Sequence, residues 1–208
     1  MPLTFSETLS NSTQIRLWTL TETEADLLEG LTLSDLAKTN LNRRKSELHR
    51  KHYLAIRQLL LGLGIAPFIH QYNAFGAPYL TDGRYVSITH TKDLAAVVLS
   101  PSPVGIDVEY YQEKIKKIAP RFLHAEEASR THQQDQVDYL TQIWTAKEAL
   151  YKVFGQKGVH FSQQLLIHPF AIREPKGKGS VFIADQQHDY HLFFRYFENY
   201  CLTLAQPY

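Results

Sequence analysis

The segment VGIDVE, residues 104–109, decides how this sequence of 208 residues folds. Its apolar side chains alternate with other residues, a pattern typical of a β-strand with one buried face. Successive side chains on a strand point in opposite directions, so the two valines and the isoleucine share one face. Asp107 and Glu109 then share the other face, about 6.5–7 Å apart along the strand. The segment is expected to present two carboxylates side by side.

A natural boundary, the sequence SPSPV at residues 100–104, directly precedes this strand. On each side of it, periodicity and turn residues predict one strand, then helices, then several strands. Helices are expected over residues 21–31, 34–61 and 114–155, the last interrupted at Pro120. Strands are expected at residues 14–20, 68–72, 79–80, 85–89, 95–99, 104–109, 164–167, 181–184, 190–196 and 200–205. The run KGKG, residues 176–179, predicts a flexible hairpin loop. This order predicts an α+β fold with two domains, residues 1–103 and 104–208.

Composition excludes several classes of protein. Hydrophobic residues make up 44% and charged residues 21% of the chain, as in ordinary soluble proteins. The net charge of +1 gives no field that would favour nucleic acid or a membrane as partner. One cysteine, Cys201, cannot form an internal disulfide, which fits a reducing compartment. With no signal peptide and no apolar run of about 20 residues, a cytoplasmic protein is expected.

The two acids of the predicted strand favour a metal site. Two carboxylates close together on one face repel each other unless a cation lies between them or water screens them. Hard oxygen ligands of this kind suit Mg²⁺. The alternative is an exposed strand end at which Asp107 and Glu109 are simply solvated. The segment alone leaves both interpretations open.

The segment WTAKEALYK, residues 144–152, predicts a helix with an unusual lysine. Lys147 falls inside the broad apolar face, where a structural helix would avoid a charge. Either its stem extends the ammonium to solvent, or the ammonium meets a buried partner. Glu148 and Lys152 could be an ordinary surface ion pair worth about 0.3–0.5 kcal/mol. Alternatively, Glu148 is a third carboxylate of the metal site, and the lysines hold phosphate oxygens.

Two further segments carry groups that suit a phosphate. The run SITHT, residues 87–91, ends a predicted strand in hydroxyl groups around His90. A basic stretch spans residues 43–57 of the long predicted helix. A histidine at a strand end is more often structural, and a basic stretch is more often a solvated helix face. Neither segment identifies a site by itself.

Taken together, four motifs resemble those of the 4′-phosphopantetheinyl transferase superfamily. They are SITHT (87–91), GIDVE (105–109), RFLHAEE (121–127) and WTAKEALYK (144–152). Length and layout resemble its monomeric, surfactin-synthetase-activating type. The resemblance implies a pseudo-duplicated fold of two similar α+β subdomains with the active site in the cleft between them. It also implies that coenzyme A donates phosphopantetheine to a serine of an apo acyl or peptidyl carrier protein, with Mg²⁺ bound.

The resemblance also assigns the residues of the reaction centre. Asp107, Glu109 and Glu148 would bind Mg²⁺. Glu148 is in addition our preferred base for the attacking serine, and Glu127 is the second choice. Lys152 would contact the diphosphate and stabilise or protonate the leaving phosphate, 3′,5′-ADP.

Contacts to coenzyme A follow from the same motifs. His90 would contact a phosphate, Thr89 takes the place of the usual serine, and Lys147 matches the lysine of a lysine–glutamate pair. Three residues of the basic stretch are candidates for the 3′-phosphate: Arg50, Lys51 and Arg57. The chain departs from the family at Ala77, where members usually carry a lysine. Ala77 cannot supply that charge.

Two other functions remain open at this point. The same three acids could serve another Mg²⁺-dependent phosphoryl-transfer enzyme or a phosphohydrolase. The missing lysine at Ala77 would suit an inactive homologue that binds coenzyme A or a carrier protein. Phosphoester cleavage without coenzyme A would favour the first alternative. The complete set of acids argues against the second.

Overall fold

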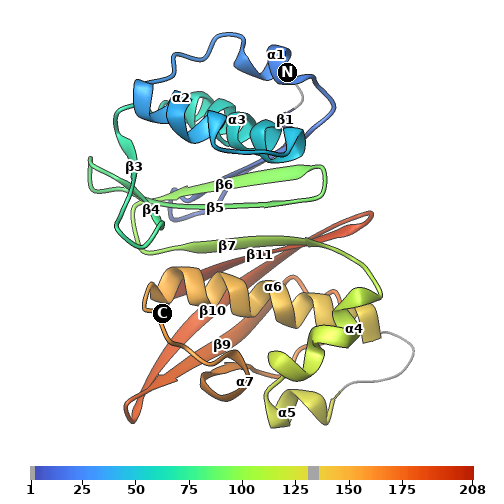
Figure 1. Cartoon of the computed structure of the whole chain (residues 1–208). Coiled ribbons are helices and arrows are strands. Elements are labelled where there is room, and N and C mark those ends of the chain that lie inside the picture. Colours follow the sequence, from blue (N-terminus) through green and yellow to red (C-terminus); the bar gives the residue numbers. More distant parts are fainter. Residues whose placement is uncertain (1–2, 131–135) are drawn as a thin grey trace. The chain divides into compact units, whose positions relative to one another are not determined.

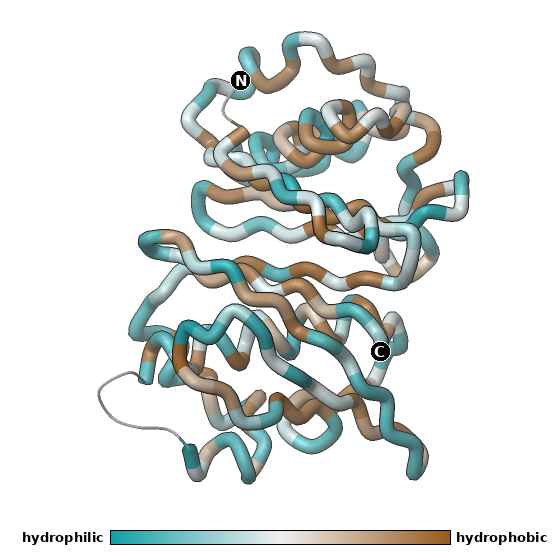
Figure 2. Tube along the Cα trace, turned by 180° about the vertical axis from the view of Figure 1, so that it is seen from behind, coloured by the Kyte–Doolittle hydropathy of each residue, from teal (hydrophilic) through white to brown (hydrophobic). Residues whose placement is uncertain are grey.

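Helices and antiparallel strands form both halves of the chain, so the fold is mixed α/β (Figure 1). The computed structural model describes residues 3–130 and 136–208. The chain divides into two compact units, residues 1–102 and 103–208. Along the helices and strands, hydrophobic and hydrophilic residues are interspersed, as expected for elements with one buried face (Figure 2). No helix in the described part is long and apolar enough to cross a membrane.

The first unit is built on a four-stranded antiparallel sheet with the order β1-β2-β6-β5. Its strands are β1 (Leu3–Thr8), β2 (Gln14–Thr19), β5 (Tyr85–Thr91) and β6 (Leu94–Ser100). A separate two-stranded sheet pairs β3 (His70–Tyr72) with β4 (Pro78–Leu80). The helices are α1 (Glu24–Leu28), α2 (Asp35–Asn42) and α3 (Glu47–Gly62).

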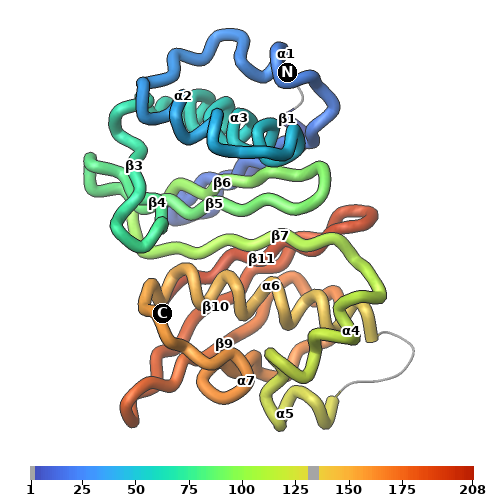
Figure 3. The backbone as a smooth tube through the Cα atoms, in the orientation of Figure 1, coloured from blue at the N-terminus to red at the C-terminus, as the bar shows by residue number. Residues whose placement is uncertain are grey.

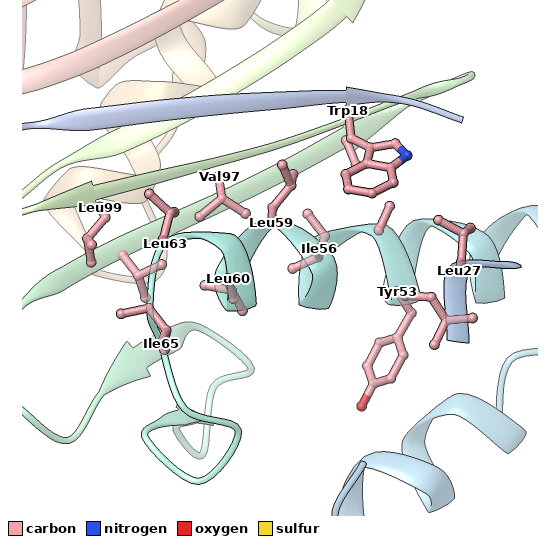
Figure 4. Packing of buried hydrophobic residues seen from close by; sticks show 14 of the residues in the cluster. Trp18, Leu27, Tyr53, Ile56, Leu59, Leu60, Leu63, Ile65, Val97 and Leu99 are labelled. Carbon is pink, nitrogen blue, oxygen red and sulfur yellow. The ribbon is translucent and has the colours of Figure 1, made fainter. Parts of the chain in front are cut away.

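Helix α3 is the centre of the hydrophobic core of the first unit. Leu59 of α3 lies on the side of the sheet, with Val97 of β6 and Trp18 of β2 (Figure 4). Tyr53 lies on the opposite side of the helix, turned away from the strands (Figure 4). The helix is therefore buried on two sides. One side packs on the sheet, and the opposite side, which carries Tyr53, is covered by α2 and neighbouring segments.

The second unit has a five-stranded antiparallel sheet with the order β7-β11-β10-β9-β8. Its strands are β7 (Gly105–Tyr110), β8 (Leu165–Ile167), β9 (Lys176–Ile183), β10 (Gln186–Phe197) and β11 (Tyr200–Pro207). Its helices are α4 (Lys114–Ile118), α5 (Ala125–Ala128), α6 (Gln136–Phe154) and α7 (Phe161–Gln164), with a 3₁₀ turn at Ala119–Arg121. The smooth trace shows α6 running along the sheet (Figure 3).

A glycine permits the close approach of α6 to β7. A Cβ atom on Gly105 would lie 2.0 Å from the carbonyl oxygen of Ala149 and 2.8 Å from the backbone nitrogen of Val153. Both are backbone atoms of α6, so no side chain could move aside. Only glycine fits at position 105. The face of β7 that contains Gly105 therefore lies in direct contact with the backbone of α6.

Several expectations from the sequence differ from the structure. Strand β1 was not predicted, and the expected helix over 34–61 is two helices, α2 and α3. Residues 43–46 separate them, and the Arg50 guanidinium holds this break by donating to the carbonyl oxygens of Arg44 and Lys45 at 3.1 and 3.3 Å. The predicted flexible loop at residues 176–179 is wrong, because these residues begin β9. Gly177 leaves room there for the ring of Phe194.

The two units share one sequence of elements. In each, a strand is followed by a long helix and, later, by a hairpin. These elements are β2, α3 and β5–β6 in the first unit and β7, α6 and β10–β11 in the second. In both units the last strand of the hairpin pairs with the first strand, β6 with β2 and β11 with β7.

Candidate functional site

The acids of β7 face helix α6. Gly105 touches the backbone of α6, and the alternation of side chains puts Asp107 and Glu109 on the same face of the strand. On α6, Trp144, Glu148 and Lys152 follow one another at intervals of four residues, so they form one stripe. The strand and the helix thus bring together the four predicted residues Asp107, Glu109, Glu148 and Lys152. Trp144, which belongs to the same helix motif, lies with them.

The two ends of the stripe contact the two acids directly. The Lys152 ammonium donates to Asp107 Oδ1 at 2.8 Å and to the carbonyl oxygen of Ile106 at 2.9 Å. At the other end, Trp144 Nε1 donates to Glu109 Oε1 at 3.2 Å. Since Asp107 is buried, the ammonium compensates a charge that the interior would otherwise disfavour.

On the stripe, Glu148 lies between Trp144 and Lys152, and it interacts electrostatically with both Asp107 and Glu109. Burial raises the pKa of Glu148 to about 7, and the negative charges of Asp107 and Glu109 act in the same direction. The Lys152 ammonium lowers this pKa and does not outweigh them. The sequence prediction that Glu148 joins the two strand acids agrees with this placement. A carboxyl group with a pKa near neutrality can exchange a proton at physiological pH.

The chemistry of this group of acids fits a divalent cation. It offers only carboxylate oxygens, and its negative charge exceeds that of Lys152. Within residues 3–130 and 136–208, however, no three His, Cys, Asp or Glu side chains already stand in position to coordinate one ion. In this arrangement Lys152 occupies one oxygen atom of Asp107.

Lys147 and Glu127 form a second, internal arrangement. The side chains of both are 0% exposed, and Lys147 Nζ lies 2.8 Å from Glu127 Oε2. The ammonium also donates to the carbonyl oxygens of Phe122, Phe161 and Leu165 at 2.6, 2.9 and 2.8 Å. Of the two alternatives for Lys147, the buried partner is therefore confirmed. Burial lowers the pKa of Lys147, and the Glu127 carboxylate opposes this.

This arrangement corrects two role assignments made from the sequence. Glu127 also accepts hydrogen bonds from the backbone nitrogens of His124 and Ile167, at 2.8 and 2.7 Å. With all its oxygen atoms engaged inside the protein, it is a poor candidate for a catalytic base. Lys147 is equally enclosed and cannot touch coenzyme A in this conformation. Both residues instead fasten α6 to the segments around it.

In the first unit, His90 borders a cavity of about 330 Å³. The imidazole rings of His90 and His52 stack with centroids 4.4 Å apart. The residues that line the cavity are Arg44, His49, His52, Tyr53, Ile56, Tyr72, Ile88 and His90. Burial, followed by the neighbouring His90, lowers the pKa of His52 to about 4. Among the described residues that line it are several donors and no carboxylate, so the cavity suits an anion.

The other residues predicted for coenzyme A lie elsewhere in the first unit. Arg50 is paired with Glu24 at 2.8 Å, and Lys51 does not line the cavity. Arg57 borders a different cavity. Thr89 is buried on the face of β5 opposite to His90. Their contacts with coenzyme A stay predictions.

Sequence reasoning missed the residues that accompany His90. Arg44, His49 and His52 belong to the basic stretch, but the residues predicted from it are Arg50, Lys51 and Arg57. A usable signal was present: His49, His52, Tyr53 and Ile56 follow at i, i+3, i+4 and i+7, which is one helix face. No role was predicted for Trp144 either, although its indole N–H donates to Glu109.

Comparisons with known proteins find similarity over the part of the chain that contains β7 and α6. Residues 103–205 match the sequence model of the 4′-phosphopantetheinyl transferase superfamily. A 4′-phosphopantetheinyl transferase of Aneurinibacillus migulanus, gsp, is 31% identical over 113 residues, 51% of this chain and 47% of that protein. A 4′-phosphopantetheinyl transferase of Bacillus subtilis is 29% identical over 126 residues, 59% of this chain and 54% of that protein. The matched region spans about half the length of these relatives.

Proposed function

This chain belongs, through residues 103–205, to the 4′-phosphopantetheinyl transferase superfamily, and from that premise we propose its reaction. It transfers the 4′-phosphopantetheine group of coenzyme A to a serine of an apo acyl or peptidyl carrier protein, and 3′,5′-ADP leaves. The observation that carries the proposal is the stripe of α6 that sets Glu148 and Lys152 against Asp107 of β7.

The two acids of β7 and the one acid of the α6 stripe suit Mg²⁺ as a ligand set. Asp107, Glu109 and Glu148 would hold it, and it would neutralise charge on the diphosphate of coenzyme A. The raised pKa of Glu148 reflects first its burial and then the repulsion from Asp107 and Glu109. The same repulsion is relieved when a cation binds, which favours binding at this place.

The residues of the chain supply the proton transfer and the positioning. Glu148 takes the proton of the carrier serine as the serine oxygen forms its bond to the β-phosphorus. The bond between that phosphorus and the oxygen bridging to the leaving group breaks with both electrons. Lys152 stabilises the negative charge that develops on the 3′,5′-ADP oxygen. Its contact with Asp107 at 2.8 Å holds the ammonium beside the proposed cation site.

The cavity at His90 would hold the 3′-phosphate end of coenzyme A. Arg44 and three histidines provide donors there without a competing acid. These groups make up for the lysine that the family usually has at the position of Ala77. We further propose that the enzyme is monomeric and cytoplasmic.

Mass spectrometry of carrier proteins tests the reaction. The chain is incubated with coenzyme A, Mg²⁺ and several apo carriers of the acyl and peptidyl types. We expect at least one carrier to gain the mass of phosphopantetheine, and the gain to require Mg²⁺. No gain on any carrier, or phosphoester cleavage of coenzyme A without a carrier, would overturn the proposal. Light scattering of the purified chain tests the monomer.

A further inference from the structure

A second and larger cavity is bordered by α2 and by the C-terminal half of α3. Its volume is about 680 Å³, within the range of about 300–1,000 Å³ typical of small-molecule sites. Its walls come from α2, from α3 and from residues 30–34 and 65–72. The apolar part is formed mainly by Leu31, Leu33, Leu36, Leu60, Leu61 and Ile65. The cavity is therefore a largely apolar site of ligand size.

One charged side chain stands at this cavity. Among the described residues that line it, Arg57 is the one Lys or Arg, and no Asp or Glu is present. The guanidinium lies over the ring of Tyr53, 3.4 Å from its centroid, and donates to the Tyr53 carbonyl oxygen at 3.2 Å. It also donates to the Tyr53 hydroxyl group. These partners are neutral, so they leave the charge of Arg57 uncompensated.

An uncompensated, half-buried arginine is unusual. Charged side chains are rarely withdrawn from water unless a partner of opposite charge accompanies them. Within the described chain, no carboxylate forms an ion pair with Arg57. Burial lowers its pKa accordingly. Arg50, on the same helix, forms an ion pair with Glu24. Two arginines of α3 therefore differ in whether a carboxylate accompanies them.

Arg44 and Arg57 border different cavities, although Tyr72 lines both. The ring of Tyr53 lies between two guanidinium groups, with Arg44 at 4.0 Å and Arg57 at 3.4 Å from its centroid. Arg44 lines the cavity of His90, and Arg57 lines the apolar cavity. The other titratable side chains there are His70 and Tyr72. Burial and the neighbouring Arg57 lower the pKa of His70 to about 4, so it is neutral at pH 7. Arg57 is thus the source of charge on this side of Tyr53.

We propose that this cavity binds a small amphipathic anion, an acyl chain that ends in a carboxylate. The chain would lie among the leucines, and the carboxylate would accept hydrogen bonds from the Arg57 guanidinium. A partner helix is less suitable, since 680 Å³ corresponds to about one turn of a helix 10–12 Å wide. Arg57 is also one of the residues predicted from the sequence for the 3′-phosphate of coenzyme A, so competition with coenzyme A separates the two assignments.

Calorimetry with three probes on the full chain tests this site. The probes are decanoate, 1-decanol and acetate, all below the concentrations at which they aggregate. We expect decanoate to bind, 1-decanol to bind at least fivefold more weakly, and acetate not to bind measurably. Equal affinities of decanoate and 1-decanol would contradict a role for the charge. Displacement of decanoate by coenzyme A would also overturn the proposal, because the cavity would then belong to the coenzyme A site.

Variants separate the apolar walls from the charge. Arg57→Leu should weaken decanoate binding at least tenfold and leave 1-decanol unchanged, whereas the matched Arg44→Leu should alter neither. Ala66→Trp, which fills the cavity, should abolish both. Circular dichroism verifies that each variant is folded. Unchanged decanoate affinity in a folded Arg57→Leu or Ala66→Trp protein would refute the site.

Discussion

The two units have the same order of strand, long helix and hairpin, but their helices and strands carry different functional side chains, basic in the first unit and mainly acidic in the second. In the first unit, α3 sets His52 against His90 of β5, at the edge of a cavity without carboxylates. In the second unit, α6 sets Glu148 and Lys152 against the acids of β7. The shared layout thus provides a helix against a strand, and the side chains decide whether an anion or a cation is attracted there.

The units also differ in how the helix is held. In the second unit, a buried Lys147–Glu127 pair and the close approach at Gly105 fix α6. In the first unit, a cavity of about 680 Å³ remains beside α3. A rigid helix suits a site that must position reacting atoms, because small displacements reduce catalysis strongly. A helix beside an open cavity suits binding.

The comparison predicts its largest effect at Glu148. Glu148→Gln keeps the shape of the side chain and removes the base and the negative charge, so kcat for holo-carrier formation should fall about 10²- to 10⁴-fold. Steady-state kinetics with a carrier that the wild type modifies measures this fall. The control is Glu126→Gln, which changes a largely exposed carboxylate of α5 and should leave kcat unaltered. A Glu148→Gln enzyme within threefold of the wild type would remove Glu148 from the reaction.

The next effect concerns the closeness of helix and strand. Gly105→Ala should lower the free energy of unfolding by about 1–3 kcal/mol, because the new methyl group meets backbone atoms of α6 that cannot rotate away. Gly62→Ala in α3 is the matched control, since its methyl group would meet only the end of the Arg16 side chain. Urea denaturation compares the two. Equal stabilities would mean that α6 is not pressed on β7.

A third substitution tests the anion cavity of the first unit. Arg44→Leu should raise the KM for coenzyme A roughly tenfold and leave kcat nearly unchanged, as expected when a binding contact away from the reacting atoms is lost. Lys51→Leu, which removes a neighbouring charge outside the cavity, should change KM much less. If the two variants behave alike, general positive charge rather than this cavity explains binding.

The smallest expected effect is the pH dependence of stability through His52. Its pKa is about 4 in the folded chain, against about 6.5 when unfolded, because burial and the adjacent His90 disfavour its charge. The unfolded state therefore binds more protons between these values, and stability falls as the pH falls from 6.5 to 4. Urea denaturation should detect a loss of about 1 kcal/mol from His52 between pH 7 and 5.5. His52→Phe should flatten this part of the profile, and an unchanged profile would contradict the buried, neutral state.

Local pattern was sufficient for much of the second unit. Alternation placed Asp107 and Glu109 on one face, whereas Glu148 was assigned to them only through the resemblance of its motif. Lys147 stood out because a charge interrupted an apolar face, but its partner could not be identified. Glu127 lies 20 positions away in sequence, and nothing local indicates that its carboxylate points inward.

Residues that depend on packing between distant segments were harder to predict. The break between α2 and α3 is held by Arg50, which the basic pattern suggested as a phosphate ligand. The glycines of residues 176–179 indicated flexibility, whereas Gly177 is there to accommodate Phe194 on the neighbouring strand. In both cases the deciding contact is a tertiary one, and composition carries no information about it.

Terbium luminescence tests the central claim, that the acids of β7 and α6 form a divalent-cation site. Trp144 donates to Glu109 at 3.2 Å, so a Tb³⁺ ion at this site would be excited through the indole ring. The account predicts sensitised emission that Mg²⁺ suppresses by competition. The emission should disappear in Asp107→Asn and Trp144→Phe and persist in Trp18→Phe, which removes the other tryptophan. Emission that is absent from the wild type, or that survives Asp107→Asn unchanged, would contradict the claim.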